Sequence, residues 1–160
     1  MTQTRILALL LVLSAVNLAL MVPGGFIETR NFPGYSVAVL AAFNVFLTLL
    51  GFASLVLAYR IVHSGRIGTL PALAGAAFTA IYLLDLATLF PVTTVPMSTT
   101  LAAMEWIGAV LGVALIVHGG RLAFVGGERA SRTSRLPPGL TIAMGVTMLA
   151  IIVFATVSAM

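Results

Sequence analysis

The chain has 160 residues, of which 61% are hydrophobic and only 8% charged, with a mean hydropathy of +1.17. Soluble domains contain roughly 45 to 50% apolar residues, so this composition predicts an integral membrane protein. Cysteine is absent, which excludes a disulfide framework, a thiolate zinc site, an iron–sulfur cluster and a cysteine nucleophile. The net charge is +4, but the arginines flank apolar segments and do not alternate with aromatics, so we expect membrane lipids and not nucleic acid as partners.

Five apolar segments have the length that a membrane helix requires, which is roughly 17 to 25 residues. They cover about residues 6–22, 37–58, 70–90, 101–118 and 140–159. Proline supports three of the boundaries, because Pro23 follows the first segment, and Pro71 and Pro91 bracket the third. The sequence therefore predicts an all-α integral membrane protein, a bundle of five transmembrane helices in a single domain over residues 1–160.

The first segment has an alternative interpretation as a secretory signal peptide, since Arg5 precedes an apolar run. No good small-residue cleavage site precedes Pro23. We therefore expect this segment to be the first membrane helix.

The arginines predict the orientation of these helices. Five alternating spans place all but one of the eight basic residues on the same side, namely Arg5, Arg60, Arg66, Arg121, Arg129, Arg132 and Arg135. The positive-inside rule makes that side cytoplasmic. The N-terminus is then cytoplasmic and the C-terminus outside, and the abundance of Ala, Gly, Leu, Val and Arg suggests a bacterial inner membrane. The basic run at residues 128–135 falls in the last cytoplasmic loop, where it serves as a topology determinant.

Acidic residues concentrate at the opposite, outer side. Asp85 and Glu105 lie about one helical turn inside the third and fourth spans, on the order of 6 to 8 Å below the outer boundary. Asn17 and Asn44 occupy similar depths in the first and second spans, and the first outer loop contains Glu28 and Arg30. Tyr82 precedes Asp85 by three residues, which places both on one helix face.

These polar groups are predicted to converge, because a polar side chain facing lipid remains unsatisfied at a cost of several kcal/mol. The ligand or ion-binding candidates are Asp85, Glu105, Asn17, Asn44, Glu28, Arg30 and Tyr82. A purely structural alternative stays open, in which Arg30 pairs with Asp85 or Glu105 and ties the outer loop to the bundle. Gly108 and Gly112 form a small-residue pair that indicates close helix packing, without showing which helix is the partner.

His63 and His118 provide a weaker hypothesis, ligation of a haem or a metal near the cytoplasmic side. Both lie in glycine-containing segments at span ends, where histidine commonly contacts headgroups. No metal site or cofactor is predicted from them, and no catalytic triad, metalloprotease, phosphate-loop or dinucleotide motif occurs.

Three functions fit the sequence. Its small size, its lack of motifs and its close-packing stripes favour a helix-packing subunit of a larger membrane complex or a homo-oligomer. The acidic outer side favours a self-contained protein that binds or transports a cation, a proton or an amphiphile. The least favoured is an enzyme acting on a lipid or quinone, with Asp85 or Glu105 as acid or base and Arg30 holding an anionic group.

Overall fold

The computed structural model describes residues 3–65, 67–126 and 138–160, and within these ranges the chain is all-helical with no strand. Its helices are α1 (Gln3–Leu20), α2 (Val37–Ser64), α3 (Leu70–Leu86), α4 (Thr99–Gly126) and α5 (Pro138–Ser158). By length and composition, α1, α2, α4 and α5 can each cross a membrane, whereas α3 has 17 residues. The structure thus agrees with the predicted class of an apolar helical membrane protein. Arg66 and the basic run at residues 128–135 lie outside the described residues.

Several helix ends differ from the sequence-based expectation. Helix α2 continues to Ser64, where Gly65 adopts a left-handed conformation with φ of 64° and its N–H binds the carbonyl oxygen of Ile61. Helix α4 extends through Gly119 and Gly120, so His118 lies inside a helix and not at its boundary. Helix α3 stops at Leu86, earlier than the expected residue 90, and Thr88 has a positive φ of 55° that a right-handed helix cannot continue. Hydropathy locates the apolar segments, whereas the residues at which the helices end depend on local backbone geometry.

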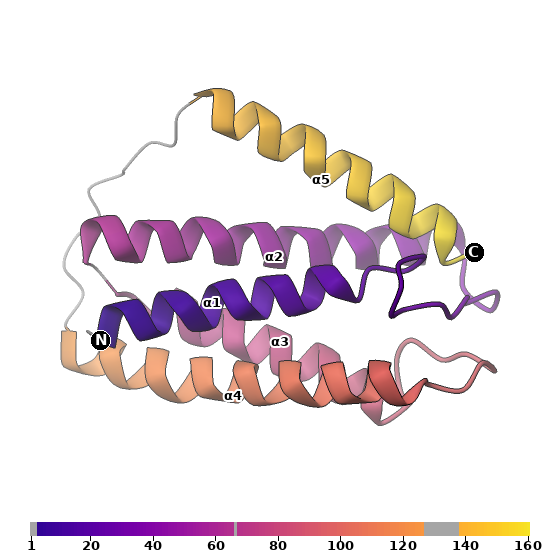
Figure 1. Ribbon diagram of the computed structural model, residues 1–160, viewed down its shortest axis with the longest axis horizontal. Coiled ribbons are helices and arrows are strands. Elements are labelled where there is room, and N and C mark those ends of the chain that lie inside the picture. The colour runs from indigo at the N-terminus through magenta and orange to yellow at the C-terminus, as the bar shows by residue number, and fades with distance from the viewer. Residues whose placement is uncertain (1–2, 66, 127–137) are drawn as a thin grey trace.

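The bundle packs around α1, which lies against α2 and α4, while α3 packs chiefly on α4 (Figure 1). Buried side chains from these helices form the main apolar core, among them Leu7, Leu11, Phe78 and Leu115. The N-terminus and C-terminus lie at opposite ends of the bundle, as an odd number of antiparallel helices requires.

Helix α5 diverges from the rest of the bundle (Figure 1). Of the described helices only α2 packs against it. Only 11% of its most apolar stretch is buried within the chain. Its C-terminal end is nevertheless attached: the Asn44 side chain donates a hydrogen bond to the Thr156 hydroxyl, and the Phe32 N–H donates to the Ala159 carbonyl oxygen. No pattern in the sequence indicates this polar attachment.

Glycines bring the backbones of α3 and α4 into direct contact. A Cβ atom on Gly75 would lie 2.6 Å from the Gly112 carbonyl oxygen and 2.7 Å from the Leu115 Cβ, and one on Gly112 would lie 2.9 Å from the Gly75 carbonyl oxygen. The packing surface that Gly112 predicts is therefore used within the chain, against α3.

We expect Gly75→Ala to lower the stability of the bundle by about 1 to 3 kcal/mol, because the added methyl group has only backbone and packed side chains to displace. Thermal unfolding in mild detergent, followed by the fluorescence of the single Trp106, measures the effect. Gly120→Ala is the matched control, since a Cβ there meets no atom within 4 Å. Equal unfolding temperatures for the two variants would contradict the proposed close packing.

Candidate functional site

A buried guanidinium, that of Arg30, is the centre of the polar cluster. Its Nε donates to Glu28 Oε1 at 3.0 Å and its Nη2 to Glu28 Oε2 at 2.6 Å. On its other edge, Nη1 and Nη2 donate to Asp85 Oδ1 and Oδ2 at 3.0 and 2.6 Å. Both carboxylates are thus bound in the two-point geometry that suits a planar guanidinium. The ring of Phe32 lies 5.6 Å from Arg30 Cζ, within the range of a cation–π contact.

This arrangement fixes the loop before α2 onto the bundle. Glu28 and Arg30 come from the loop, whereas Asp85 lies in the last turn of α3. Gly24 helps to shape the loop, because its φ is +82° and a Cβ there would collide with Ser158 of α5. The Thr93 hydroxyl donates to the Asn31 carbonyl oxygen at 2.7 Å, so the loop that precedes α4 joins the same assembly.

The guanidinium of Arg30 keeps its positive charge although it is buried. Burial alone lowers the pKa of Arg30, but its hydrogen bonds to Glu28 and Asp85, and the negative charges of both, raise that pKa above its ordinary value. The guanidinium therefore stays positive throughout the physiological pH range.

A third carboxyl group, Glu105 of α4, is close to Arg30 but less completely paired. Its Oε1 lies 3.8 Å from Arg30 Nη2, its carboxyl group also interacts with that of Asp85, and Oε2 accepts no hydrogen bond from the described part of the chain. Glu105 is only 3% exposed, and Glu28 and Asp85 are 5% and 8% exposed. Three buried carboxyl groups thus face one guanidinium, and full ionisation leaves two negative charges uncompensated.

Asn17 and Tyr82 form a second layer beside Glu105. The Asn17 amide donates to the Tyr82 hydroxyl and to the Met104 carbonyl oxygen, both at 3.2 Å, while the described residues provide no partner for its Oδ1. Gly108 permits this contact, because a Cβ on α4 at that position would collide with the Tyr82 ring and lie 2.7 Å from the Asn17 amide nitrogen. The glycine therefore serves the polar layer as well as helix packing.

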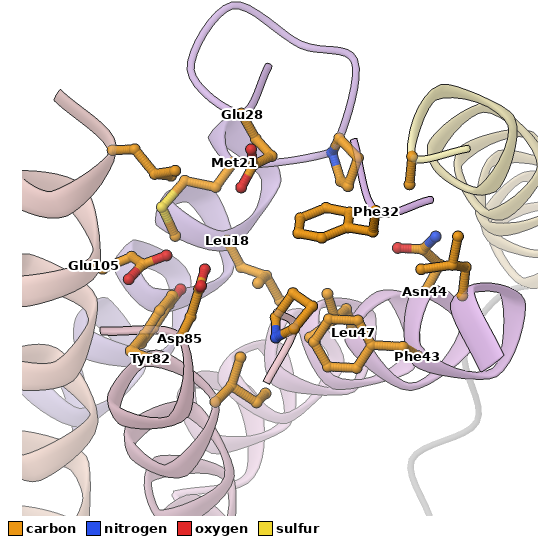
Figure 2. A pocket seen from close by; sticks show the side chains of 16 residues that line it. Leu18, Met21, Glu28, Phe32, Phe43, Asn44, Leu47, Tyr82, Asp85 and Glu105 are labelled. Carbon is orange, nitrogen blue, oxygen red and sulfur yellow. The ribbon is translucent and has the colours of Figure 1, made fainter. Parts of the chain in front are cut away.

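A small cavity of about 60 Å³ adjoins the three carboxyl groups. In Figure 2, Glu28, Asp85 and Glu105 reach one side of this cavity, Asn44 lies at the other side, and Phe32 and Phe43 lie between them. The cavity has room for a small group, and its polar side is acidic.

The structure brings the sequence-derived candidates into two groups. Glu28, Arg30, Asp85 and Glu105 form the charged cluster, with Asn17 and Tyr82 beside it. Asn44 lines the cavity on the far side, bonded to α5. Sequence reasoning missed Phe32 and Thr156, and it did not pair Glu28 with Arg30. The two-residue separation of opposite charges in an apolar chain was the available signal for that pair.

The two histidines lie apart from this cluster. His63 Nδ1 is 2.9 Å from the Tyr59 carbonyl oxygen, and His118 Nε2 is 3.4 Å from the Gln3 carbonyl oxygen. Among the residues described, no group of three or more His, Asp or Glu side chains has a metal-binding arrangement. The histidines thus contact backbone carbonyl groups of α2 and α1.

Residues 3–135 match the family described as a domain of unknown function, DUF8051. This match covers most of the chain, so the protein belongs to that family. No curated protein and no solved structure matches this chain. The matched region contains every member of the charged cluster, whereas α5 lies beyond it.

We expect Arg30→Ala to destabilise the protein by about 3 to 5 kcal/mol, because removing one partner from a buried ion pair leaves the carboxylates uncompensated. Thermal unfolding in detergent measures the loss. Arg5→Ala, which removes an exposed arginine at the other end of the bundle, is the control.

A double-mutant cycle that combines Arg30→Ala with Asp85→Ala separates the energy of the ion pair from the loss of stability that each substitution causes by itself. The double variant should be more stable than the sum of the single losses predicts, since Asp85 is then no longer a carboxylate without its guanidinium partner. Strict additivity would contradict a direct energetic coupling between Arg30 and Asp85.

Proposed function

We propose that the protein is a membrane-embedded binding protein that takes a cationic group into the acidic site beside Arg30. The observation that carries this proposal is Glu105, a 97% buried side chain next to a cavity, with one carboxyl oxygen unpartnered among the described residues. Burying an unpaired carboxylate is costly, so such a group is retained where something else neutralises it. A cation in the cavity would supply the missing charge.

The alternative roles for the cluster are less well supported by its geometry. A solely structural ion pair needs one carboxylate for Arg30, and Glu28 and Asp85 already provide two. An enzyme that uses Arg30 to hold an anionic group needs several free N–H donors, yet Nε and both N–H groups of Nη2 donate to carboxylates, and Nη1 also donates to Asp85. Cation binding uses the surplus of acid and leaves Arg30 in place.

The location that we propose is a bacterial inner membrane, with this site toward the outside. Arg5, Arg60 and Arg121 belong to the start of α1 and the late parts of α2 and α4, which lie at one end of the bundle, and Arg30 belongs to a loop at the other end (Figure 1). This asymmetry supports a cytoplasmic N-terminus by the positive-inside rule.

We expect methylammonium, sodium or calcium ions to raise the unfolding temperature of the purified protein, because a ligand that binds only the folded state stabilises it by mass action, by about 2.7 kcal/mol at a hundred times its Kd. Trp106 fluorescence during heating at constant ionic strength detects the shift. Glu105→Gln should abolish it, whereas Arg5→Gln, remote from the cluster, should not.

The stabilisation should also weaken as the pH falls, since protonated carboxyl groups no longer attract a cation. Failure of all three cations to shift the unfolding temperature, or equal shifts in wild type and Glu105→Gln, would argue against the proposal.

A helix-packing role is the second candidate, and α5 is the observation that favours it. Its outward face presents a continuous apolar stripe with more than half of each side chain exposed, at Ile142, Val146, Leu149, Val153 and Val157. Another membrane helix could cover this stripe as readily as lipid does.

For this second role we expect a partner chain to co-purify in fixed stoichiometry from the native membrane in mild detergent. Val146→Arg together with Val153→Arg should remove the partner and leave the α3–α4 contact unaffected. Purification as a lone chain, identified by its mass in the detergent micelle, would exclude a stable subunit role.

A further inference from the structure

A second cavity, larger and mainly apolar, lies next to the acidic site. It is a groove of about 180 Å³ between α1, α2 and α5. Its lining includes Gly51, Phe52 and Leu55 of α2 and Ile151 of α5. Only Asn44 and Thr48 in this lining are polar, so the groove suits a hydrocarbon chain.

The groove and the acidic cavity share a wall. Leu18, Met21, Pro23, Asn44 and Leu47 line both. Asn44 is fixed at this junction by its hydrogen bond to Thr156, and it is 4% exposed. A molecule with one polar end could therefore place that end at the carboxyl groups and extend its remainder into the groove.

The position of the groove indicates how a hydrocarbon chain could reach it. It lies along the middle of α2 and beside α5, the helix that diverges from the bundle (Figure 1). Both helices have the length and composition of membrane spans. A hydrocarbon chain that enters the groove from the bilayer exchanges one apolar environment for another, so the groove contributes packing contacts and not a hydrophobic gain.

The charge of the headgroup follows from the carboxyl groups. Glu28, Asp85 and Glu105 carry more negative charge than Arg30 neutralises, and the unpartnered oxygen of Glu105 can accept a hydrogen bond. An ammonium group supplies both a positive charge and N–H donors. A headgroup that also carries a phosphate is disfavoured, because the phosphate would place a further negative charge beside the buried carboxylates.

We propose that the ligand is an amphiphile with a cationic amine headgroup, bound with its head beside Glu105 and its alkyl chain in the groove between α1, α2 and α5. This inference rests on the proposed cation-binding function and adds the chemical class of the ligand.

Photo-crosslinking in phosphatidylcholine nanodiscs tests it. The probes are octadecylamine and octadecanol with the same photoreactive diazirine in the chain, and the labelled residues are identified by mass spectrometry. The amine should label Phe52, Leu55 and Ile151 about tenfold above the alcohol, a factor within the range of couplings measured for close charge pairs at interfaces. Glu105→Gln should reduce amine labelling to the level of the alcohol.

A groove variant separates the chain from the head. Gly51→Leu places a larger side chain in the groove, where the nearest atom to a new Cβ, Leu18 Cδ2, is 3.8 Å away. It should reduce amine labelling severalfold while the stabilisation by methylammonium remains. Gly145→Leu on α5, where a Cβ meets no atom within 4 Å, is the control and should label as wild type does.

The outcomes distinguish the two proposals. If methylammonium stabilises the protein but amine and alcohol label the groove equally, the site binds cations and the amphiphile inference is wrong. If methylammonium does not stabilise the protein and Glu105→Gln does not change the amine labelling, both the cation-binding function and the amphiphile inference are wrong. The comparison of amine with alcohol uses the unmodified protein, so it decides the question even if Gly51→Leu does not fold.

Discussion

The buried guanidinium of Arg30 makes the interactions on which the end of the bundle opposite the N-terminus depends. It binds Glu28 of its own loop and Asp85 of α3, each at two points, and lies within ion-pair distance of Glu105 on α4. In an apolar chain such a group has few alternatives, because a charge withdrawn from water requires partners nearby. Loop, α3 and α4 are therefore held in one arrangement by a single side chain, and the cavity beside them takes its acidic character from the partners of that side chain.

Glycine has the complementary role of setting how closely the helices approach. Gly75 and Gly112 place the backbones of α3 and α4 in contact, and Gly108 makes room for Tyr82 and Asn17. Without a strong hydrophobic force between helices in lipid, such close contacts and interhelical hydrogen bonds stabilise a membrane bundle. The same glycines bring polar side chains from α1, α3 and α4 to one level, so packing and the candidate site have a common origin.

Helix α5 differs from the other helices in both respects. It has no charged side chain and packs on α2 alone among the described helices, yet its C-terminal end is bonded to α2 through Thr156 and to the loop before α2 through Ala159. It also lies outside the region that matches the family. One end of α5 thus closes the groove next to the acidic cavity, and the rest remains available to lipid or to another helix.

The sequence by itself determined the helical, apolar class, because the length and hydropathy of each segment are local properties that the bilayer constrains strongly. It also indicated that Asp85, Glu105, Asn17 and Asn44 lie at similar depth, since residue spacing along a helix sets height. Only the tertiary structure decided which of these groups touch Arg30, because rotation of each helix about its axis and the path of the loop depend on packing between distant residues. The pairing of Arg30 with Glu28, the unpartnered oxygen of Glu105 and the groove beside α5 follow from that packing, and no local pattern encodes them.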